Sequence, residues 1–405
     1  MSTLKAALPV TSIAVMALAA LPALAATVSV TNNNDDGAGS FRAAVEAANL
    51  NPAITSIRFN GDRGTIALQT SVIYTGAQPL RIDGRGTDIA AAAPQTIDLF
   101  VAEAGGDLTL RNLTFRDGDN GILVEVPASA EGQVSVALYD VTVVDNLRFG
   151  LSIDEDDPAP GKPFAASISL VVASSHFARN GLLITPDEDE GDVDAVRVNE
   201  RGDGDITAAV LNSVFIDNGA DGFELDEEGP GDATLTALGS SFDDNGVTRV
   251  GGDDGLDIDE SDDGSIWLNV VDSTFNGSTD DGIGLDESDG GDLHITLVQV
   301  EASLNVDSGI SADEGGGGNY EAKFVLVTAD ENEDKGADMT EAGDGDFDGR
   351  AITSSFSFNA DDGIAVEQLD AGSGVLELVN VTIEGNGNQR IDADGVDVIE
   401  IGPSS

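Results

Sequence analysis

The sequence predicts a right-handed parallel β-helix, an all-β solenoid in which the short strands of successive coils stack on one another. Three observations lead to this prediction. A phrase of the form Asp-x-Gly-apolar-x-apolar recurs along the chain, its glycines return every 27 residues over five consecutive copies, and apolar and polar residues alternate after each glycine. Fixed periods of about 20–50 residues are typical of solenoids, and alternation is typical of strands rather than helices.

One glycine marks each copy of the repeat. Between Gly255 and Gly363 the interval stays at 27 residues, and elsewhere it lengthens to between 29 and 41 residues, which indicates insertions in turns. The repeat glycines are Gly121, Gly150, Gly181, Gly222, Gly255, Gly282, Gly309, Gly336, Gly363 and Gly395.

Stacking the 27-residue copies gives columns of similar residues. Two apolar columns follow the repeat glycine, and they begin at Leu256 and at Ile258. A second strand supplies two more, which begin at Ile266 and Val270. A further column contains glycine alone, namely Gly264, Gly291, Gly318, Gly345 and Gly372. This column predicts a tight turn where φ is positive or where a Cβ would clash.

A coil of this length has room for three short strands and three turns. Like strands stack on like strands, so we expect parallel ladders around a column of aliphatic side chains. The right-handed crossover is the strong default for parallel connections.

The chain divides into a leader over residues 1–25, an N-terminal cap over 26–60 and the β-helix over 61–405. Ser40 is a candidate N-cap for a helix over Phe41–Asn49, in which Phe41, Ala44, Val45 and Ala48 share one face. Such a helix would cover the open end of the first coil, which is otherwise an exposed sheet edge. No comparable helix is expected near Gly395–Gly402.

Residues 1–25 have the form of a secretory signal peptide. Lys5 supplies a positive charge, an apolar run follows from Ile13 to Leu24, and Ala23-Leu24-Ala25 offers a cleavage site. We therefore expect a secreted, periplasmic or cell-surface protein that does not insert in a membrane once the signal is removed. The chain contains no cysteine, so its stability must come from a long core.

The charge excludes one class of partner. With 75 acidic and 18 basic residues the formal net charge is -57, and such a surface repels nucleic acid and anionic lipid. It should attract divalent cations or suit a saline medium. Disorder is not expected, because apolar residues make up 40% of the chain and recur with strand spacing.

Two stretches resemble known protein families. The opening Val30–Asn32 with Asp36–Val45 resembles the N-terminal cap of many secreted bacterial β-helix proteins. The phrases Asn112–Phe115 and Asp272–Phe275 resemble repeats of the pectate-lyase-like superfamily. The resemblance covers nearly the whole chain after the leader and implies the fold. It implies no single activity, because that superfamily includes polysaccharide lyases, glycoside hydrolases, adhesins and proteins without known activity.

Acidic columns are the first candidate site. One lies two residues before each repeat glycine and consists of Asp253, Asp280, Asp307, Asp334 and Asp361. The others follow the first strand and consist of Asp259, Asp286 and Asp313 with Glu260, Glu287 and Glu314. Coils lie roughly 4.8 Å apart, and carboxylates at that distance repel by on the order of 1 kcal/mol in water.

Three arrangements could offset the repulsion between the carboxylates of these columns. The columns could bind Ca²⁺, which takes six to eight oxygen ligands. They could be screened in a saline habitat, or each Asp could accept turn N–H groups in an Asx-turn. The spacing matches neither an EF-hand nor the nonapeptide calcium repeat, so the calcium hypothesis rests on charge geometry.

The second candidate site is an outward patch on the second strand. Its residues are Trp267, His294, Glu321, Lys323, Asp348 and Arg350. An aromatic ring beside charged groups suits a sugar, with Trp267, Glu321 and Asp348 as binding residues. Lys323, Arg350 or His294 could act as base in lyase chemistry if a cation acidified the proton beside a uronate carboxylate. The simpler interpretation is ion pairing of Glu321 with Lys323 and of Asp348 with Arg350.

The leading hypothesis is a non-enzymatic secreted protein with a structural, adhesive or surface-binding role, stabilised by Ca²⁺ or salt. Its partner would be a polysaccharide or another cell-surface component. The alternative is an extracellular polysaccharide lyase or glycoside hydrolase acting on the patch. The sequence lacks the Gly-His-Gly motif of polygalacturonase-like hydrolases and the Arg-x-Pro-x-x-Arg motif of pectate lyases.

Overall fold

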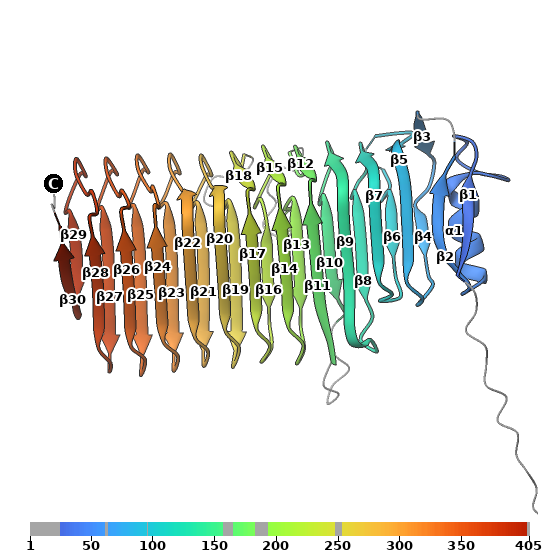
Figure 1. The fold of residues 1–405 in the computed structure, drawn as a ribbon. Coiled ribbons are helices and arrows are strands. Elements are labelled where there is room, and N and C mark those ends of the chain that lie inside the picture. Colours follow the sequence, from blue (N-terminus) through green and yellow to red (C-terminus); the bar gives the residue numbers. More distant parts are fainter. Residues whose placement is uncertain are drawn as a thin grey trace, which may run out of the picture.

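The protein is an elongated stack of β-coils with one helix at its N-terminal end (Figure 1). The computed structural model describes residues 25–60, 64–94, 96–156, 165–182, 193–247 and 253–402. Residues 1–24 of the expected signal peptide fall outside these ranges. Among the described residues, none forms a helix long and apolar enough to cross a membrane.

The strands pair in parallel and form two sheets that run the length of the stack. Within the described residues, the smaller sheet has 12 strands, one per coil. They are β4 (Val72–Tyr74), β6 (Phe100–Ala102), β8 (Ile122–Val126), β10 (Leu151–Glu155), β13 (Val196–Glu200), β16 (Glu224–Glu227), β19 (Leu256–Asp262), β21 (Ile283–Asp289), β23 (Ile310–Gly316), β25 (Ala337–Gly343), β27 (Ile364–Asp370) and β29 (Ile391–Asp394).

The larger sheet has 18 strands and bends around the remaining side of each coil. They are β1 (Ala26–Val30), β2 (Ile54–Phe59), β3 (Thr65–Leu68), β5 (Leu80–Ala91), β7 (Leu108–Arg116), β9 (Glu131–Val144), β11 (Ala165–Ala173), β12 (His176–Ala178), β14 (Ile206–Leu211), β15 (Val214–Ile216), β17 (Ala233–Leu238), β18 (Ser241–Asp243), β20 (Ile266–Thr274), β22 (Leu293–Glu301), β24 (Tyr320–Val325), β26 (Phe347–Ile352), β28 (Gly374–Val379) and β30 (Val396–Ile401).

The observed register confirms the predicted columns and, with them, the parallel β-helix. Leu256 pairs with Ile283, and Ile258 pairs with Leu285. The column that begins at Ile266 is likewise continuous through β22, β24 and β26. These side chains are buried in one core that runs through the stack, so each coil is stabilised by its two neighbours.

Close approach of backbones explains the column of glycines. A Cβ added at Gly264, Gly291 or Gly318 would overlap the carbonyl oxygen of the glycine one coil earlier. Of the five members only Gly372, at the C-terminal end of the column, has a positive φ, of 151°. The turn therefore requires glycine mainly because no space remains for a side chain.

The third strand of the coils is the shortest. It spans three residues in β12, β15 and β18. Further along the chain it shrinks to isolated bridges, such as the one between Thr328 and Ser355. The coil therefore has two long sides and one short side.

The capping helix is present as α1 (Phe41–Leu50), one residue longer than predicted. The Ser40 hydroxyl accepts a hydrogen bond from the Ala43 N–H at 3.1 Å. The predicted face of Phe41, Ala44, Val45 and Ala48 is the buried one. Because β1 pairs with β2 and β2 with β5, residues 26–60 continue directly into the larger sheet.

A buried asparagine ladder, which the sequence analysis did not identify, lines one turn of the stack. Its members are Asn146, Asn180, Asn218, Asn245, Asn305, Asn332, Asn359 and Asn386. Within it, the Asn332 amide donates to the Ala302 carbonyl and to Asn359 Oδ1, and its Oδ1 accepts from Asn305. Ser278 interrupts the ladder, and its buried hydroxyl has no hydrogen-bond partner.

The last described coil carries a charged residue at an inward position. Glu400 occupies the register position of the buried Leu378. Its carboxylate pairs with the Arg390 guanidinium at 2.7 Å. A charge at an inward position of a terminal strand opposes edge-to-edge association.

Candidate functional site

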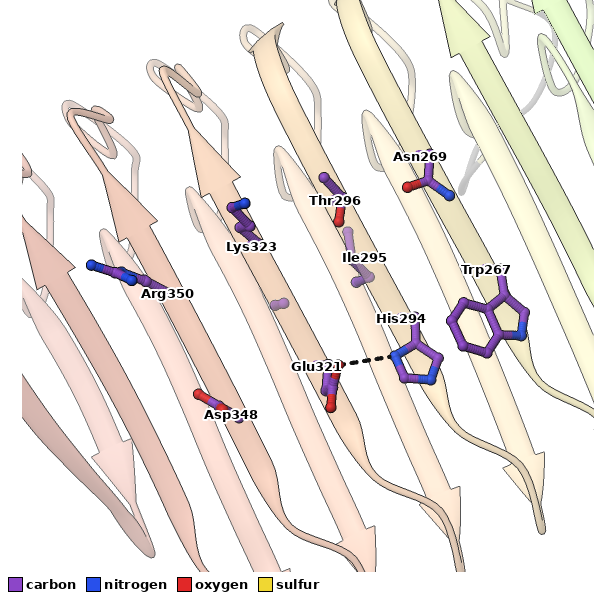
Figure 2. A pocket seen from close by; sticks show the side chains of 10 residues that line it. Trp267, Asn269, His294, Ile295, Thr296, Glu321, Lys323, Asp348 and Arg350 are labelled. Carbon is purple, nitrogen blue, oxygen red and sulfur yellow. Dashed lines mark ion pairs between the residues drawn. The ribbon is translucent and has the colours of Figure 1, made fainter.

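The predicted patch forms one continuous surface on the larger sheet, across β20, β22, β24 and β26. Trp267, His294, Glu321 and Asp348 occupy equivalent positions on the four strands. Lys323 and Arg350 lie two residues further along β24 and β26. All six residues line a shallow depression of about 440 Å³ (Figure 2). The strand alternation that buries Ile266 and Leu293 turns these side chains outward.

Trp267 and His294 form the aromatic end of the patch. Their rings stack with centroids 3.7 Å apart and planes inclined by 22°. The Trp267 side chain remains exposed. His294 Nδ1 lies 3.3 Å from Glu321 Oε2, and Nε2 lies 3.7 Å from Asp292 Oδ2. The imidazole is thus held between two carboxylates beside an open indole face.

The expected pairing of charges within the patch does not occur. Arg350 Nε lies 2.9 Å from Glu377 Oε2 on the next strand, β28, and Asp348 is not its partner. Among the described residues Lys323 makes no ion pair within 4.0 Å. The reason is geometric, since outward residues of one strand are about 7 Å apart whereas neighbouring strands are only about 4.8 Å apart.

The patch lies on an open sheet face. The residues that line it come from the four strands alone. The long insertion between Gly181 and Gly222 contributes no lining residue in its described part, and residues 183–192 lie outside the described ranges.

The aspartates before the repeat glycines form a partly buried column. Asp253 is buried, and Asp280, Asp307, Asp334 and Asp361 are half-buried. Burial, with repulsion from Asp280 and Asp334, raises the pKa of Asp307 to about 6. Carboxylate oxygens of Asp280, Asp281 and Asp307 converge to within 4.8 Å of one another.

In one coil, a lysine side chain pairs with the aspartate of this column. Lys335 Nζ lies 2.9 Å from Asp334 and 2.9 Å from Asp338. Lys335 lies one residue before its repeat glycine, a position occupied by Asp254 and Asp281 in earlier coils. The Lys335 ammonium thus neutralises acidic charge in its own coil, whereas the preceding coils have an aspartate at that position.

The two acidic columns after the first strand face opposite ways. Asp259, Asp286 and Asp313 are exposed on the outer surface of the smaller sheet. Their neighbours Glu260, Glu287 and Glu314 are buried inside the coil. The six residues therefore cannot form one metal site, because adjacent residues of a strand point to opposite faces.

The buried glutamates belong to a longer series, which we call the glutamate ladder. It consists of Glu155, Glu200, Glu227, Glu260, Glu287, Glu314 and Glu341, and Gln368 continues it. Neighbouring carboxylates at this spacing would repel by about 3 kcal/mol at an effective dielectric constant of 20. Protonating a carboxyl of ordinary pKa at pH 7 costs about as much free energy as one such repulsion. A ladder glutamate with two charged neighbours is therefore more stable in its protonated form.

A further acidic cluster escaped the sequence analysis. Oxygens of Asp194, Asp221 and Glu224 lie within 4.8 Å of one another, and all three residues are buried. Arg197 pairs with Glu224 at 3.1 Å and lies 3.7 Å from Asp194 Oδ2. Asp194 Oδ2 and Glu224 Oε2 accept no hydrogen bond. Burial raises the pKa of Asp194 to about 8.

The fold and the patch together define a parallel β-helix with an open, mixed-charge face on its larger sheet. No protein-family model matches the chain, and no curated protein matches it. Solved structures with a similar fold include the A-module of a mannuronan C-5 epimerase from Azotobacter vinelandii, with 12% identity, a TM-score of 0.48, and coverage of 92% of this chain and 97% of that one.

Two other solved structures have a similar fold. A pectate lyase is 16% identical, with a TM-score of 0.44, over 89% of this chain and 80% of its own. A surface protein and adhesin of Streptococcus pneumoniae is 10% identical, with a TM-score of 0.41, over 91% of this chain and 100% of its own. At these identities the likeness concerns the fold alone.

Proposed function

We propose that this protein is an extracellular polysaccharide-binding β-helix with an adhesive or surface-binding role. The observation that supports the proposal is the depression that contains Trp267, His294, Glu321, Lys323 and Arg350. Aromatic faces stack on the apolar faces of sugar rings, and charged side chains at a fixed spacing bind the hydroxyl or carboxylate groups around them. The absence of a loop wall among the lining residues suits a long polymer better than a small molecule.

The single tryptophan of the chain makes this proposal directly testable. Trp267 is the only tryptophan, so its fluorescence reports on the depression alone. Titration with soluble neutral and carboxylated polysaccharides should change that fluorescence saturably for at least one of them. Trp267→Ala should weaken binding of that polymer, measured by calorimetry, by at least tenfold.

The control is another outward aromatic residue on the same sheet. Tyr139 on β9 stacks under the Arg111 guanidinium, 4.2 Å from its ring centroid, several coils away from the patch. Tyr139→Ala should leave binding unchanged. Equal losses in the two variants, or no polysaccharide that alters the fluorescence, would remove the patch as a carbohydrate site.

A second candidate function is a polysaccharide lyase or hydrolase centred on the same residues. The observation that favours it is the Lys323 side chain, which lines the depression and has no ion-pair partner among the described residues. A Lys323→Ala/Arg350→Ala variant should lose any lyase activity, followed by the absorbance of unsaturated products. Activity that persists in this variant would exclude the patch as its source.

Calcium binding is the third part of the proposal, and we place it at two acidic groups. These are Asp280, Asp281 and Asp307, and the buried cluster of Asp194, Asp221 and Glu224. One oxygen of Asp194 and one of Glu224 accept no hydrogen bond, which supports a cation there beside Arg197, since buried carboxylates need compensation. The exposed Asp259 column is expected to be screened by salt.

Thermal unfolding in EGTA, in millimolar Ca²⁺ and in NaCl of matched ionic strength tests calcium binding. A ligand of the native state alone stabilises it by RT ln(1 + [L]/Kd). A saturable rise in Tm with Ca²⁺ that NaCl does not reproduce would support specific sites. Equal rises would mean that the carboxylates need only screening.

A further inference from the structure

The glutamate ladder has no role in carbohydrate binding, because its side chains lie inside the coil. Its seven glutamates are at most 1% exposed. Successive members from Glu200 to Glu341 are direct partners across adjacent strands. The ladder thus places one buried carboxyl group above another through consecutive coils of the solenoid.

Glu260, Glu287 and Glu314 each have one carboxyl oxygen that accepts a backbone hydrogen bond and one that accepts none. The N–H groups of Gly264, Gly291 and Gly318 donate to Oε1 of Glu260, Glu287 and Glu314 at 2.7–2.9 Å. Oε2 of the same three glutamates is buried and accepts no hydrogen bond.

Those donors are the glycines of the tight turn, where an added Cβ would overlap the preceding coil. The glycine column and the glutamate ladder therefore form one structure, in which the turn N–H groups orient the carboxyls along the axis of the stack.

We propose that the glutamate ladder is a file of neutral carboxylic acids, each donating its O–H to a carboxyl oxygen in the next coil. The otherwise unpartnered oxygens are then hydrogen-bonded without any metal ion. Each proton replaces the repulsion between carboxylates of neighbouring coils with a hydrogen bond, so it stabilises the contact between those coils.

The C-terminal end of the ladder supports this assignment. Gln368 occupies the next position after Glu341, and its amide is the neutral isostere of a protonated glutamate. Its Oε1 accepts from the Phe347 N–H at 3.0 Å, and its Nε2 donates to the Gly345 carbonyl at 3.3 Å. The chain thus places a side chain that cannot ionise in the same environment.

The charged groups facing the ladder favour the neutral form. Asp262 faces Glu260 and Asp346 faces Glu341, and the one facing base is Arg201, beside Glu155. The remaining facing groups are the ladder carboxyls themselves. Burial is the largest cause of a pKa raised to about 7 at Glu260, Glu314 and Glu341, and to about 8 at Glu287.

Infrared spectroscopy tests the proposal on the folded protein. At pH 7 in EDTA, the wild type should show the C=O stretch of protonated carboxylic acids, shielded from rapid deuterium exchange. The triple variant Glu260→Gln/Glu287→Gln/Glu314→Gln should lose a large part of that band, and the single variant Glu287→Gln a smaller part. Glu367→Gln, an exposed glutamate on the outer face of β27, should lose none.

Alkaline pH gives the second readout. Burial raises the folded pKa of Glu260, Glu287 and Glu314, so stability should be highest in acid and should fall as pH rises through about 7–8. Each Glu→Gln change should reduce the number of protons released on unfolding by about one. The Tm of the variant at pH 9 should therefore be higher than that of the wild type. Absence of the carboxylic acid band at pH 7, or a divalent metal retained in EDTA and lost in the triple variant, would overturn the proposal.

Discussion

The asparagine ladder provides a quantitative test of how the coils are held together. Asn332 lies inside it, and its side chain makes four hydrogen bonds. They join it to the Ala302 carbonyl, to Asn359 Oδ1, and to the backbone and side-chain N–H groups of Asn305, at 3.0–3.2 Å. Asn332→Ala removes all four and leaves buried groups in three neighbouring residues without those partners.

The magnitude follows from these contacts. A buried hydrogen bond contributes about 1 kcal/mol net, and stranding a buried partner costs about 1–3 kcal/mol. The four bonds of Asn332 therefore predict a loss of at least about 4 kcal/mol in the free energy of unfolding. Asn388→Ala provides the control, since Asn388 is an exposed turn residue in a nearby coil and its replacement should change stability by less than about 0.5 kcal/mol.

Denaturant unfolding, followed by circular dichroism and by the fluorescence of Trp267, measures both variants. Circular dichroism reports on the whole stack, whereas Trp267 reports on coils close to the mutation. Similar midpoints for Asn332→Ala and Asn388→Ala would refute the reasoning, because buried and exposed asparagines would then be equivalent.

The interruption of the ladder gives the opposite prediction. Ser278 occupies a ladder position but its hydroxyl is unpartnered. Ser278→Asn should restore the missing bonds and stabilise the protein by about 1–2 kcal/mol. Gly255, like the glycines beside the other ladder members, leaves room for the amide. A destabilised Ser278→Asn variant would show that the turn is shaped differently there.

Three further predictions follow from single contacts. Ser40→Ala should lower the free energy of unfolding by about 1 kcal/mol, because the N-cap bond to Ala43 is lost; Ser40→Asp should restore it, and no loss in Ser40→Ala would contradict the cap. Gly318→Ala should destabilise by several kcal/mol in denaturant, because its Cβ overlaps the Gly291 carbonyl, whereas Gly317→Ala in open space should be mild. In EGTA, Asp194→Asn should raise Tm at pH 8 and not at pH 4. Burial raises the pKa of Asp194 from 3.8 to about 8 in the folded protein, so its carboxyl destabilises the fold increasingly as pH rises above 3.8, whereas asparagine does not. An equal change in Tm at both pH values would contradict that assignment.

Sequence periodicity was sufficient to predict the strands and the patch. Because the side-chain period of a strand is two, burial of Ile266 and Leu293 predicted that Trp267 and His294 face outward. Because the repeat is constant, their positions on adjacent coils were also predictable. The partner of Arg350 could not be obtained this way, since the choice between Asp348 and Glu377 depends on the distance between strands.

The acidic columns show where sequence reasoning fails. Alternation places Glu260 inward as clearly as it places Asp259 outward, but the sequence analysis grouped the two residues by their charge. The signal that identifies the interior position is Gln368 in the same column. The asparagine ladder was missed for a different reason, since its members lie in turns, where neither the strand nor the helix period applies.

The constant 27-residue repeat also makes the length of the protein adjustable. Deleting residues 282–308 would join Asp281 to Gly309, which occupies the same place in the next coil. The core columns and both polar ladders would re-form, whereas His294 would disappear and Trp267 would lie beside Glu321. Gain or loss of a whole coil can therefore redesign the outer surface without disturbing the interior, so such a chain can evolve its ligand and its stability independently.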